Sequence, residues 1–556
     1  MLKKRYAAMA MAAVMAAGAL PAYAGEVDTT EPVTVSVWLM ADDLQYYSNY
    51  ASNPVLDYVA KQNNLTFEFQ QPPMGSEQEQ FNLMIGTGEY TDVFWTGYSQ
   101  DSMSSLYEDG VIQDIAPYVE EYMPNLTAYL NGDGEENKEA KATLYDDDGH
   151  MYVLPIINTF TDNWGGMVYR RDILETMTGG NVAFPSGNDR PTTVEDWDYM
   201  LPLMKAYFDA AGMTDYACLI LPATGYFSTG DLLGGFGISG TIFVKADGSL
   251  SFGPADDNFY NYLSKMKEWY DAGYIYQDFA SRTNDVFYLP NTALTYGGSA
   301  GVWFGLAGQL GTAMSLPEYG LNVQVDAVSV PLDEAHGITE ADAGIHVYSG
   351  VTSNTTGYAV STACEEETLI RYLSAMDYFY SEEGAQQRAY GLDKEHGSEE
   401  SSVYQQLELQ DGTWFVNDEG EKEYNAVISD NGDIKTEGLM GNRLPGLTCR
   451  PIVRRCMLQE GKDLTTEASE IWSAYGESNV LPSGVTLTAE ESIKSASIYT
   501  QMTDYINSMV PKFIMGTEEL TEESFKAYQD QLESYGLSEY IEINQGAYDR
   551  YQERMQ

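Results

Sequence analysis

The sequence predicts an α/β protein built of two large lobes, each a β-sheet wound with helices, and three observations predict it. Strand-like and helix-like segments alternate between residues 33 and 95, which is typical of a parallel sheet covered by helices. At two later places a strand-like run breaks into Gly, Asn, Ser or Thr before the chain resumes, as expected at a crossing between lobes. The 556 residues contain no internal repeat and no long linker, which favours two lobes sharing several crossings over a row of domains.

The first wound unit is predicted from hydrophobic periodicity. The run VTVSVWLM alternates Val33, Val35 and Val37 with Thr34, Ser36 and Trp38 as a half-buried strand does, and LTFEFQ and TDVFW read as two further strands. Helix-like NPVLDYVAKQN and EQFNLMIGTG separate them. Ligands of wound sheets bind beyond the carboxyl ends of the strands, and Asp42, Asp43 and Trp95 fall there.

Later segments supply helices and a hairpin. In PTTVEDWDYMLPLMKAYF, Thr192 and Glu195 have capping-box spacing, and the apolar residues that follow share one helical face. ELQDGTWFVNDEGEKEYN carries two turn dipeptides around a short alternating strand, which predicts a hairpin. The last hundred or so residues read as helical, with an apolar stripe made of Ile498, Met502, Ile506, Met509 and Phe513.

The N-terminus has the pattern of a cleavable secretory signal. A basic head at residues 3–5 precedes an apolar run to Leu20 that is shorter than the ~18 residues of a membrane span, and residues 22–24 read Ala-Tyr-Ala. We expect cleavage after Ala24 and a secreted protein, extracellular or periplasmic; an N-terminal anchor helix is the alternative. The first cysteine of the chain is Cys218, so no lipid anchor at the cleavage site is predicted.

The charge is strongly acidic, with 84 Asp and Glu against 29 Lys and Arg. The net charge of −55 becomes −58 once the three basic residues of the signal are removed. Such a field repels nucleic acid and anionic lipid, so no nucleic-acid partner is expected. The acids are scattered among aromatics, which indicates a solvated surface on a folded protein and not a disordered tail.

One segment resembles a catalytic motif. Residues 297–301 read Gly-Gly-Ser-Ala-Gly after the strand-like TALTY, and a nucleophile elbow would place Ser299 on a turn between a strand and a helix. The alternative is an ordinary glycine-rich turn. A glycosidase would instead need two carboxylates close together in a cleft, and the sequence cannot select a pair among 84 acids. We therefore assign no catalytic residue and expect no enzyme, with a secreted hydrolase of either kind as the alternative.

No metal or cofactor is predicted. The four histidines form no close pair, and the chain has no H-E-x-x-H, C-x-x-C, P-loop or calcium-loop pattern. Residues 146–149, Asp-Asp-Asp-Gly, are typical of a turn. The cysteines allow a disulfide between Cys449 and Cys456 in an oxidising compartment, and the sequence leaves that bridge open.

The aromatic residues point to a sugar. Trp38, Trp95, Trp164 and Trp303 each fall at or just beyond the end of a strand-like run, beside Gly, Asp or Asn. An indole can cover the C–H face of a pyranose, while carboxylates and amides bind its hydroxyls. Packing in the core is the alternative for each of them.

Over nearly its whole mature length the chain resembles extracellular solute-binding proteins of ATP-driven (ABC) importers, in the carbohydrate-binding family-1 class and its LplA-like branch. The segments that carry the resemblance are FNLMIGTGEYTDVFW, GVIQDIAPYVEEYMPNL, YVLPI, GMVYRRDIL, PTTVEDWDYMLPLMKAYF, LSAMDYFYSEEGAQQRAYG, FIMGTEEL and QGAYDRYQ. The resemblance implies a two-lobed periplasmic-binding-protein fold (type II-like) joined by hinge strands. It also implies no catalysis, and delivery of a carbohydrate, as an oligosaccharide, to membrane permease subunits. A peptide or another small molecule is the alternative cargo, and we expect a monomer.

Two departures from the family are visible. The cleavage site lacks the lipidated cysteine common in Gram-positive members, and DAAGMTDYACLIL lacks the calcium ligands found in some oligosaccharide binders, so calcium is not carried over.

The resemblance also implies where the chain crosses between lobes. The first crossing is LPIINTFTDNW and the second lies near HVYSGVTSNTTG, while a third is expected between about 440 and 485. Lobe 1 is then 25–157 plus about 350–445, and lobe 2 is 158–349 plus about 446–556. The candidate ligand contacts are Trp38, Asp42, Trp95, Asn158, Asp162, Trp164, Trp303 and Tyr348.

Overall fold

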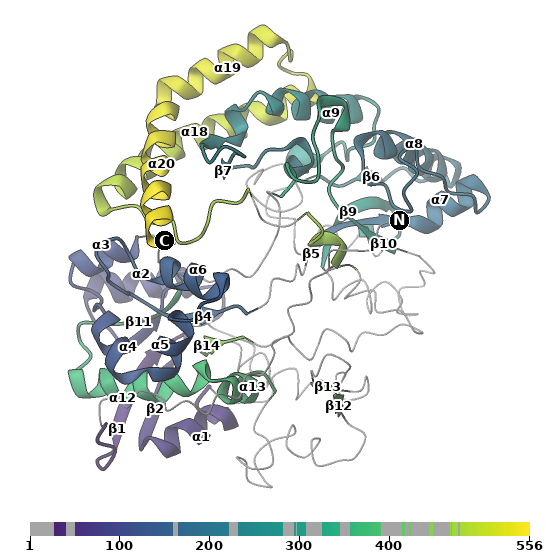
Figure 1. The fold of residues 1–556 in the computed structure, drawn as a ribbon. Helices are drawn as coiled ribbons and strands as arrows, with labels where there is room; N and C mark the ends of the chain where they lie inside the picture. Colours follow the sequence, from purple (N-terminus) through teal and green to yellow (C-terminus); the bar gives the residue numbers. More distant parts are fainter. Residues whose placement is uncertain are drawn as a thin grey trace.

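The computed structural model confirms an α/β protein of two lobes, each with its own sheet (Figure 1). It describes residues 27–39, 50–99, 101–159, 165–221, 232–281, 294–295, 297–306, 325–344, 356–390, 414–416, 422–424, 444–448, 468, 470–475 and 479–556.

Lobe 1 contains a six-stranded sheet in the order β14-β4-β11-β3-β1-β2. The strands β1, β2 and β3 run parallel, β11 runs antiparallel to both β3 and β4, and β14 is parallel to β4. Their bounds are Val33–Trp38 (β1), Leu65–Gln70 (β2), Val93–Trp95 (β3), Leu154–Ile157 (β4), Gly357–Val360 (β11) and Gly446–Leu447 (β14). The helices of this lobe are Pro54–Gln62 (α1), Glu77–Thr87 (α2), Met103–Glu108 (α3), Ala116–Tyr122 (α4), Pro124–Leu130 (α5), Glu135–Leu144 (α6), Glu366–Met376 (α12) and Glu382–Tyr390 (α13).

The predicted strand–helix alternation at the start of lobe 1 is confirmed. In β1 the apolar residues Val35 and Val37 are buried, while the polar Ser36 between them donates to Asp92 with its amide and its hydroxyl. Asn53 accepts hydrogen bonds from the amides of Val55 and Leu56, which caps α1 and fixes where it begins.

Lobe 2 contains a four-stranded sheet in the order β10-β5-β9-β6. The strand β5 is antiparallel to both of its neighbours, and β6 is parallel to β9. The bounds are Gly165–Arg170 (β5), Ala217–Leu219 (β6), Ala300–Leu306 (β9) and Val325–Val328 (β10). The helices are Arg171–Thr178 (α7), Val194–Ala210 (α8), Asn258–Asp271 (α9), Ala489–Met515 (α18), Glu522–Tyr535 (α19) and Leu537–Arg554 (α20).

Two small ribbons and several short 3₁₀ turns complete the described chain. The strands Ile242–Val244 (β7) and Leu250–Phe252 (β8) form one ribbon, and Trp414–Val416 (β12) and Lys422–Tyr424 (β13) form the other. The second ribbon confirms the predicted hairpin. The 3₁₀ turns are Tyr50–Ser52, Leu233–Phe236, Gly253–Ala255, Phe279–Ser281, Glu334–His336 and Asp377–Tyr380.

The core of lobe 2 forms around α8, α9 and α18. The indoles of Trp197 and Trp269 stack with their centroids 5.8 Å apart, which joins α8 to α9. The predicted apolar faces of α8 and α18 are buried, except that Met509 is only partly covered. The capping box of α8 was predicted one residue too early. It is made by Thr193 and Asp196, because Thr193 has the extended backbone of a cap and Asp196 also accepts from the amides of Thr192 and Ser186.

Among the described residues, no helix combines the length and the apolar character needed to span a membrane.

Candidate functional site

The connections between the two sheets are the places where one lobe could rotate against the other. The chain leaves lobe 1 after β4 and enters lobe 2 at β5, and it returns between β10 and β11. It passes again from β14 in lobe 1 to the segment at Ala468, which packs on the sheet of lobe 2. Residues 449–467 lie outside the described residues, so the place of the third crossing, expected between about 440 and 485, stays a prediction. The exact lobe boundaries stay a prediction.

On the side of lobe 1, side chains link the first connection to the third and fix the end of the second. Thr448 accepts a hydrogen bond from the amide of Thr159 at 3.1 Å, and its own hydroxyl donates to the carbonyl of Ile157 at 3.3 Å. The hydroxyl of Thr159 donates in turn to the carbonyl of Thr448. Thr96 exchanges hydrogen bonds with the backbone of Gly357, where the second connection enters β11. Each connection therefore begins or ends at a fixed point of lobe 1.

The short strand β14 is fixed by a buried arginine and a required glycine. The guanidinium of Arg388 is only 1% exposed and donates to the carbonyls of Leu444 and Leu447. Gly446 has φ 138°, and a Cβ there would lie 2.6 Å from the Cβ of Phe379. No other residue fits this position without moving the backbone of lobe 1.

Replacing Thr448 by valine is expected to lower the free energy of unfolding by about 0.5–1.5 kcal/mol, because it removes the acceptor of the Thr159 amide, whereas the carbonyl of Ile157 keeps its bond from the amide of Thr448. Urea titration measures this loss, and amide exchange at Thr159 should become faster. Thr362→Val is the control, since that hydroxyl donates to the carbonyl of Gly110 within lobe 1 and touches no connection. If exchange at Thr159 stayed the same in Thr448→Val, the hydroxyl would not hold the first connection.

On the side of lobe 2, Trp472 packs on the start of β5. Its indole N–H donates to the carbonyl of Met167 at 3.0 Å, and its ring covers Gly166 at the start of β5. A Cβ on Gly166 would lie 2.3 Å from the ring, so the close approach requires glycine. The hydroxyl of Ser329, just after β10, donates to the carbonyl of Ile471 at 3.4 Å. The indole of Trp472 therefore joins the segment that follows the third connection to the start of β5, where the first connection ends.

Trp38 and Trp95 end neighbouring strands but point to opposite faces of the sheet. Trp38 packs edge-on against Phe81 and Tyr98, and Trp95 packs against Tyr358 of β11. The two indoles belong to different core clusters, as the alternation along β3 requires. They are 5% and 7% exposed, so the protein covers almost the whole of both rings in this conformation. Ligand contact by these two residues stays a prediction.

Of the other predicted contacts, two lie in the described residues. Trp303 is 5% exposed on β9, and packs in the same cluster as Trp472. Asn158 follows β4 directly and is half-buried, at the start of the first connection. Asp42, Asp162, Trp164 and Tyr348 lie outside the described residues, so their contact with a ligand also stays a prediction.

The catalytic motif does not have the structure of a nucleophile elbow. Ser299 stands between the helical Leu294 and Thr295 and the strand β9, whereas an elbow needs a strand before the serine and a helix after it. Its hydroxyl donates to the carbonyl of Leu294 at 3.4 Å. Of the histidines in the described residues, His150 pairs with Asp114 and His336 pairs with Asp333.

The titratable groups of the described core are shifted by burial. Burial raises the pKa of the Cys218 and Cys364 thiols to about 12, which makes both poor nucleophiles and poor metal ligands. Both are free thiols, and Cys449 and Cys456 lie outside the described residues. No group of His, Cys, Asp and Glu that could hold a metal ion occurs in the part of the chain that the structure describes.

Sequence reasoning missed the residues that hold the connections. Trp472 reads as an ordinary core residue of a helix, and no local pattern distinguishes Arg388 or Thr448 from their neighbours. The pair Gly165 and Gly166 is the visible signal, because two glycines at the start of a strand indicate a close approach by something bulky. Nothing in the sequence shows that the approaching group comes from residue 472.

Comparison with known proteins gives one family and a set of similar structures. The family model of bacterial extracellular solute-binding proteins matches residues 55–394. No curated protein sequence matches the chain.

Among the solved structures, an HMO-binding solute-binding protein associated with an ABC transporter of Bifidobacterium longum infantis is 18% identical, with a TM-score of 0.68, covering 94% of this chain and 99% of that one. The substrate-binding protein FusA of S. pneumoniae in complex with kestose is 19% identical, with a TM-score of 0.66 and the same coverage. The alginate-binding protein AlgQ2 without calcium is 16% identical, with a TM-score of 0.65 and again the same coverage. These structures share the two-lobed fold of this chain.

Proposed function

The chain belongs to the bacterial extracellular solute-binding proteins, and on that premise we propose that it captures a carbohydrate between its lobes for the permease subunits of an ABC importer. The cargo is an oligosaccharide. The observation that carries the proposal is the set of three connections between two sheets with separate cores.

Hinge closure follows from this arrangement. Each lobe is a packed body, and the connections between them are few, so rotation of one lobe against the other is the softest motion. A ligand that touches both lobes gains all of its contacts only when they are closed. That difference in affinity drives the shift from the open to the closed state.

A carbohydrate is favoured over other solutes by two arguments. Three similar structures are described as binding proteins for HMO, alginate or kestose. Asn158, Asp162 and Trp164 on the first connection also offer the amide, carboxylate and indole that bind a sugar, and Asp42 and Tyr348 add to them. Trp38, Trp95 and Trp303 support the wall of this site, and reach the ligand only with their edges.

The affinity expected from such a site is moderate. Each contact contributes about 1 kcal/mol net, and a micromolar dissociation constant corresponds to about −8 kcal/mol. Most of the proposed contacts must therefore form together, which favours a ligand of several sugar units over a monosaccharide.

A thermal-shift screen against mono- and oligosaccharides, with peptides as controls, tests the proposal. A ligand at 100 times its dissociation constant is expected to add about 2.7 kcal/mol to the free energy of unfolding. Stabilisation by peptides and by no sugar would overturn the carbohydrate assignment while keeping the fold. Turnover of a sugar or an ester would instead favour a secreted hydrolase. Among the described residues, no contact supports that alternative.

The remaining parts of the proposal concern the mature protein. We propose that it starts at Gly25 after signal cleavage, acts outside the cytoplasmic membrane without a lipid anchor, and works as a monomer that does not alter its ligand. Mass spectrometry of the exported protein reads its N-terminus directly.

A further inference from the structure

The C-terminal helix α20 is built into the core of lobe 2. Tyr540 packs edge-on against Phe252 of β8, and the side chain of Gln545 accepts a hydrogen bond from the amide of Leu250 at 2.8 Å. The helix also packs on α18 and α19. It moves with lobe 2 because all of these partners belong to that lobe.

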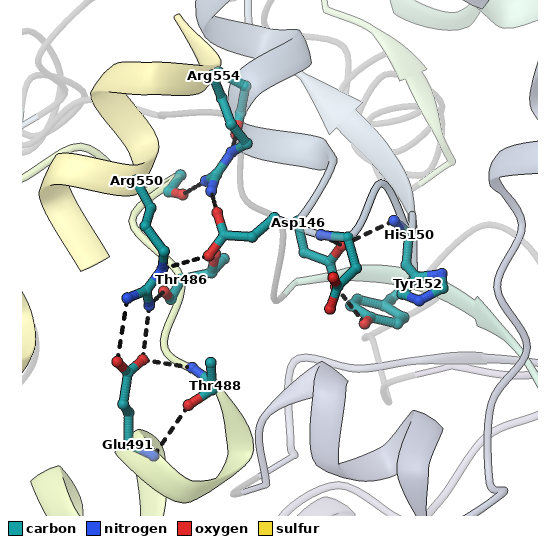
Figure 2. Close-up of polar contacts among 12 residues, drawn as sticks. Asp146, His150, Tyr152, Thr486, Thr488, Glu491, Arg550 and Arg554 are labelled. Atoms are coloured by element: carbon teal, nitrogen blue, oxygen red, sulfur yellow. Dashed lines mark hydrogen bonds and ion pairs between the residues drawn. The ribbon is translucent and has the colours of Figure 1, made fainter. Parts of the chain in front are cut away.

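The last turns of α20 nevertheless reach lobe 1. The guanidinium of Arg550 donates to the carboxylate of Asp147 at 2.5 Å, and Arg554 pairs with the other oxygen of the same carboxylate. Arg554 also donates to the carbonyl of Ala142 in α6 at 3.2 Å. Figure 1 shows the end of α20 beside α6, and Figure 2 shows both arginines directed at this acidic turn.

Lobe 1 presents Asp147 on a turn that is fixed from within. Asp146 accepts from the amides of Asp148 and His150 and from the hydroxyl of Tyr152 (Figure 2). The turn ends at Gly149 with φ 84°, a conformation that favours glycine. These bonds hold the residue next to Asp147 in place. The backbone of the turn therefore need not rearrange for the Asp147 carboxylate to bind the two arginines.

Lobe 2 fixes its side of the contact as well. Glu491 accepts two hydrogen bonds from Arg550, at 2.7 and 3.2 Å, while its carboxylate also accepts from the amide of Thr488 at the start of α18. Arg554 donates to the carbonyl of Gly484 at 2.6 Å. A Cβ on Gly484 would lie 2.7 Å from the Cα of Thr143 in α6, so this loop touches lobe 1 directly.

We propose that Arg550, Arg554 and Asp147 form a strut between the lobes, a fourth connection that is not part of the covalent hinge and that sets the angle between the lobes. Two features distinguish it from an ordinary surface pair. Its members are 14–31% exposed, and both arginines have a second fixed partner. It also lies in a protein of net charge −55, where the lobes repel each other and an arginine contact between them opposes that repulsion.

Solution scattering of the ligand-free protein tests the strut without any assumption about the cargo. Asp147→Asn is expected to give a larger radius of gyration than the wild type. General charge repulsion predicts the opposite sign, because the substitution removes one negative charge from an acidic protein. Arg550→Gln/Arg554→Gln should produce the same expansion, and combining it with Asp147→Asn should add nothing further, as expected for residues that act as a unit.

The matched control is Asp530→Asn, which removes one carboxylate from a pair with Lys526 inside α19 at 2.6 Å. It should leave the radius of gyration unchanged. Circular dichroism establishes that every variant is folded. The proposal is overturned if Asp147→Asn and the double arginine variant both keep the wild-type radius of gyration, or if the control expands as much as they do.

Discussion

Replacing Trp472 by alanine is expected to lower the free energy of unfolding by about 3–5 kcal/mol, the range typical of a buried indole that is truncated. The indole is 7% exposed, fills the space over Gly166 and donates to the carbonyl of Met167. Alanine removes the ring and leaves a cavity, since the neighbouring strands β5 and β9 are held by their own hydrogen bonds and cannot collapse into it. Denaturant titration measures the loss.

The same substitution should also weaken ligand binding, because this indole joins the segment after the third connection to the strand in which the first connection ends. Trp472→Phe separates the two effects. It keeps most of the apolar volume and loses only the hydrogen bond to Met167, which costs about 1–2 kcal/mol. If Trp472→Ala bound the ligand as tightly as the wild type at a temperature where both are folded, the indole would serve the stability of lobe 2 and not the hinge.

Lowering the pH from 7 to 4 is expected to strengthen the fold by about 2 kcal/mol through the carboxyl of Asp377 alone. Burial raises the pKa of this group from 3.8 to about 6, although the amides of Asn125 and Leu126 and the side chain of Asn125 donate to it and favour its charged form. The folded state therefore binds a proton that the unfolded state has released. This contribution is fully present below pH 3.8 and is lost as the pH rises through about 6.

Because the other acids also titrate, the measurement is a difference between two proteins. Urea titrations of the wild type and of Asp377→Asn from pH 4 to pH 7 isolate the one group. The variant loses acceptor capacity at the start of α5 and is destabilised at every pH, but its stability should lack the slope that Asp377 supplies. Parallel curves for the two proteins would show that Asp377 titrates at its ordinary pKa.

Much of the fold could be predicted because it follows from local patterns in the sequence. The strand Leu65–Gln70 has the bounds read from its alternation, and β1 begins at Val33 as expected but ends at Trp38, two residues before the end of the run VTVSVWLM. The ribbon of β12 and β13 follows from its turn dipeptides. The family resemblance rests on the order of many segments, and the match to residues 55–394 confirms it. These features depend on residues that are close together in the sequence, so a single sequence is enough to predict them.

The candidate site was harder to predict because it depends on residues far apart in the chain. The indoles at strand ends were read as exposed, yet Trp38 and Trp95 find partners on opposite faces of the sheet, and the sequence does not show which face receives them. Trp472 reaches Gly166 across more than three hundred residues. The contact of Arg550 and Arg554 with Asp147 spans an even longer separation. Such pairings are set by the packing of whole lobes.

Solution scattering with and without a saturating oligosaccharide, followed by mass spectrometry of the recovered sugar, tests the central claim most directly. Closure of two rigid lobes around an unaltered guest predicts a smaller radius of gyration in the complex and a sugar that is returned with its mass unchanged. An equal radius of gyration in both states, together with a cleaved or modified sugar, would contradict it.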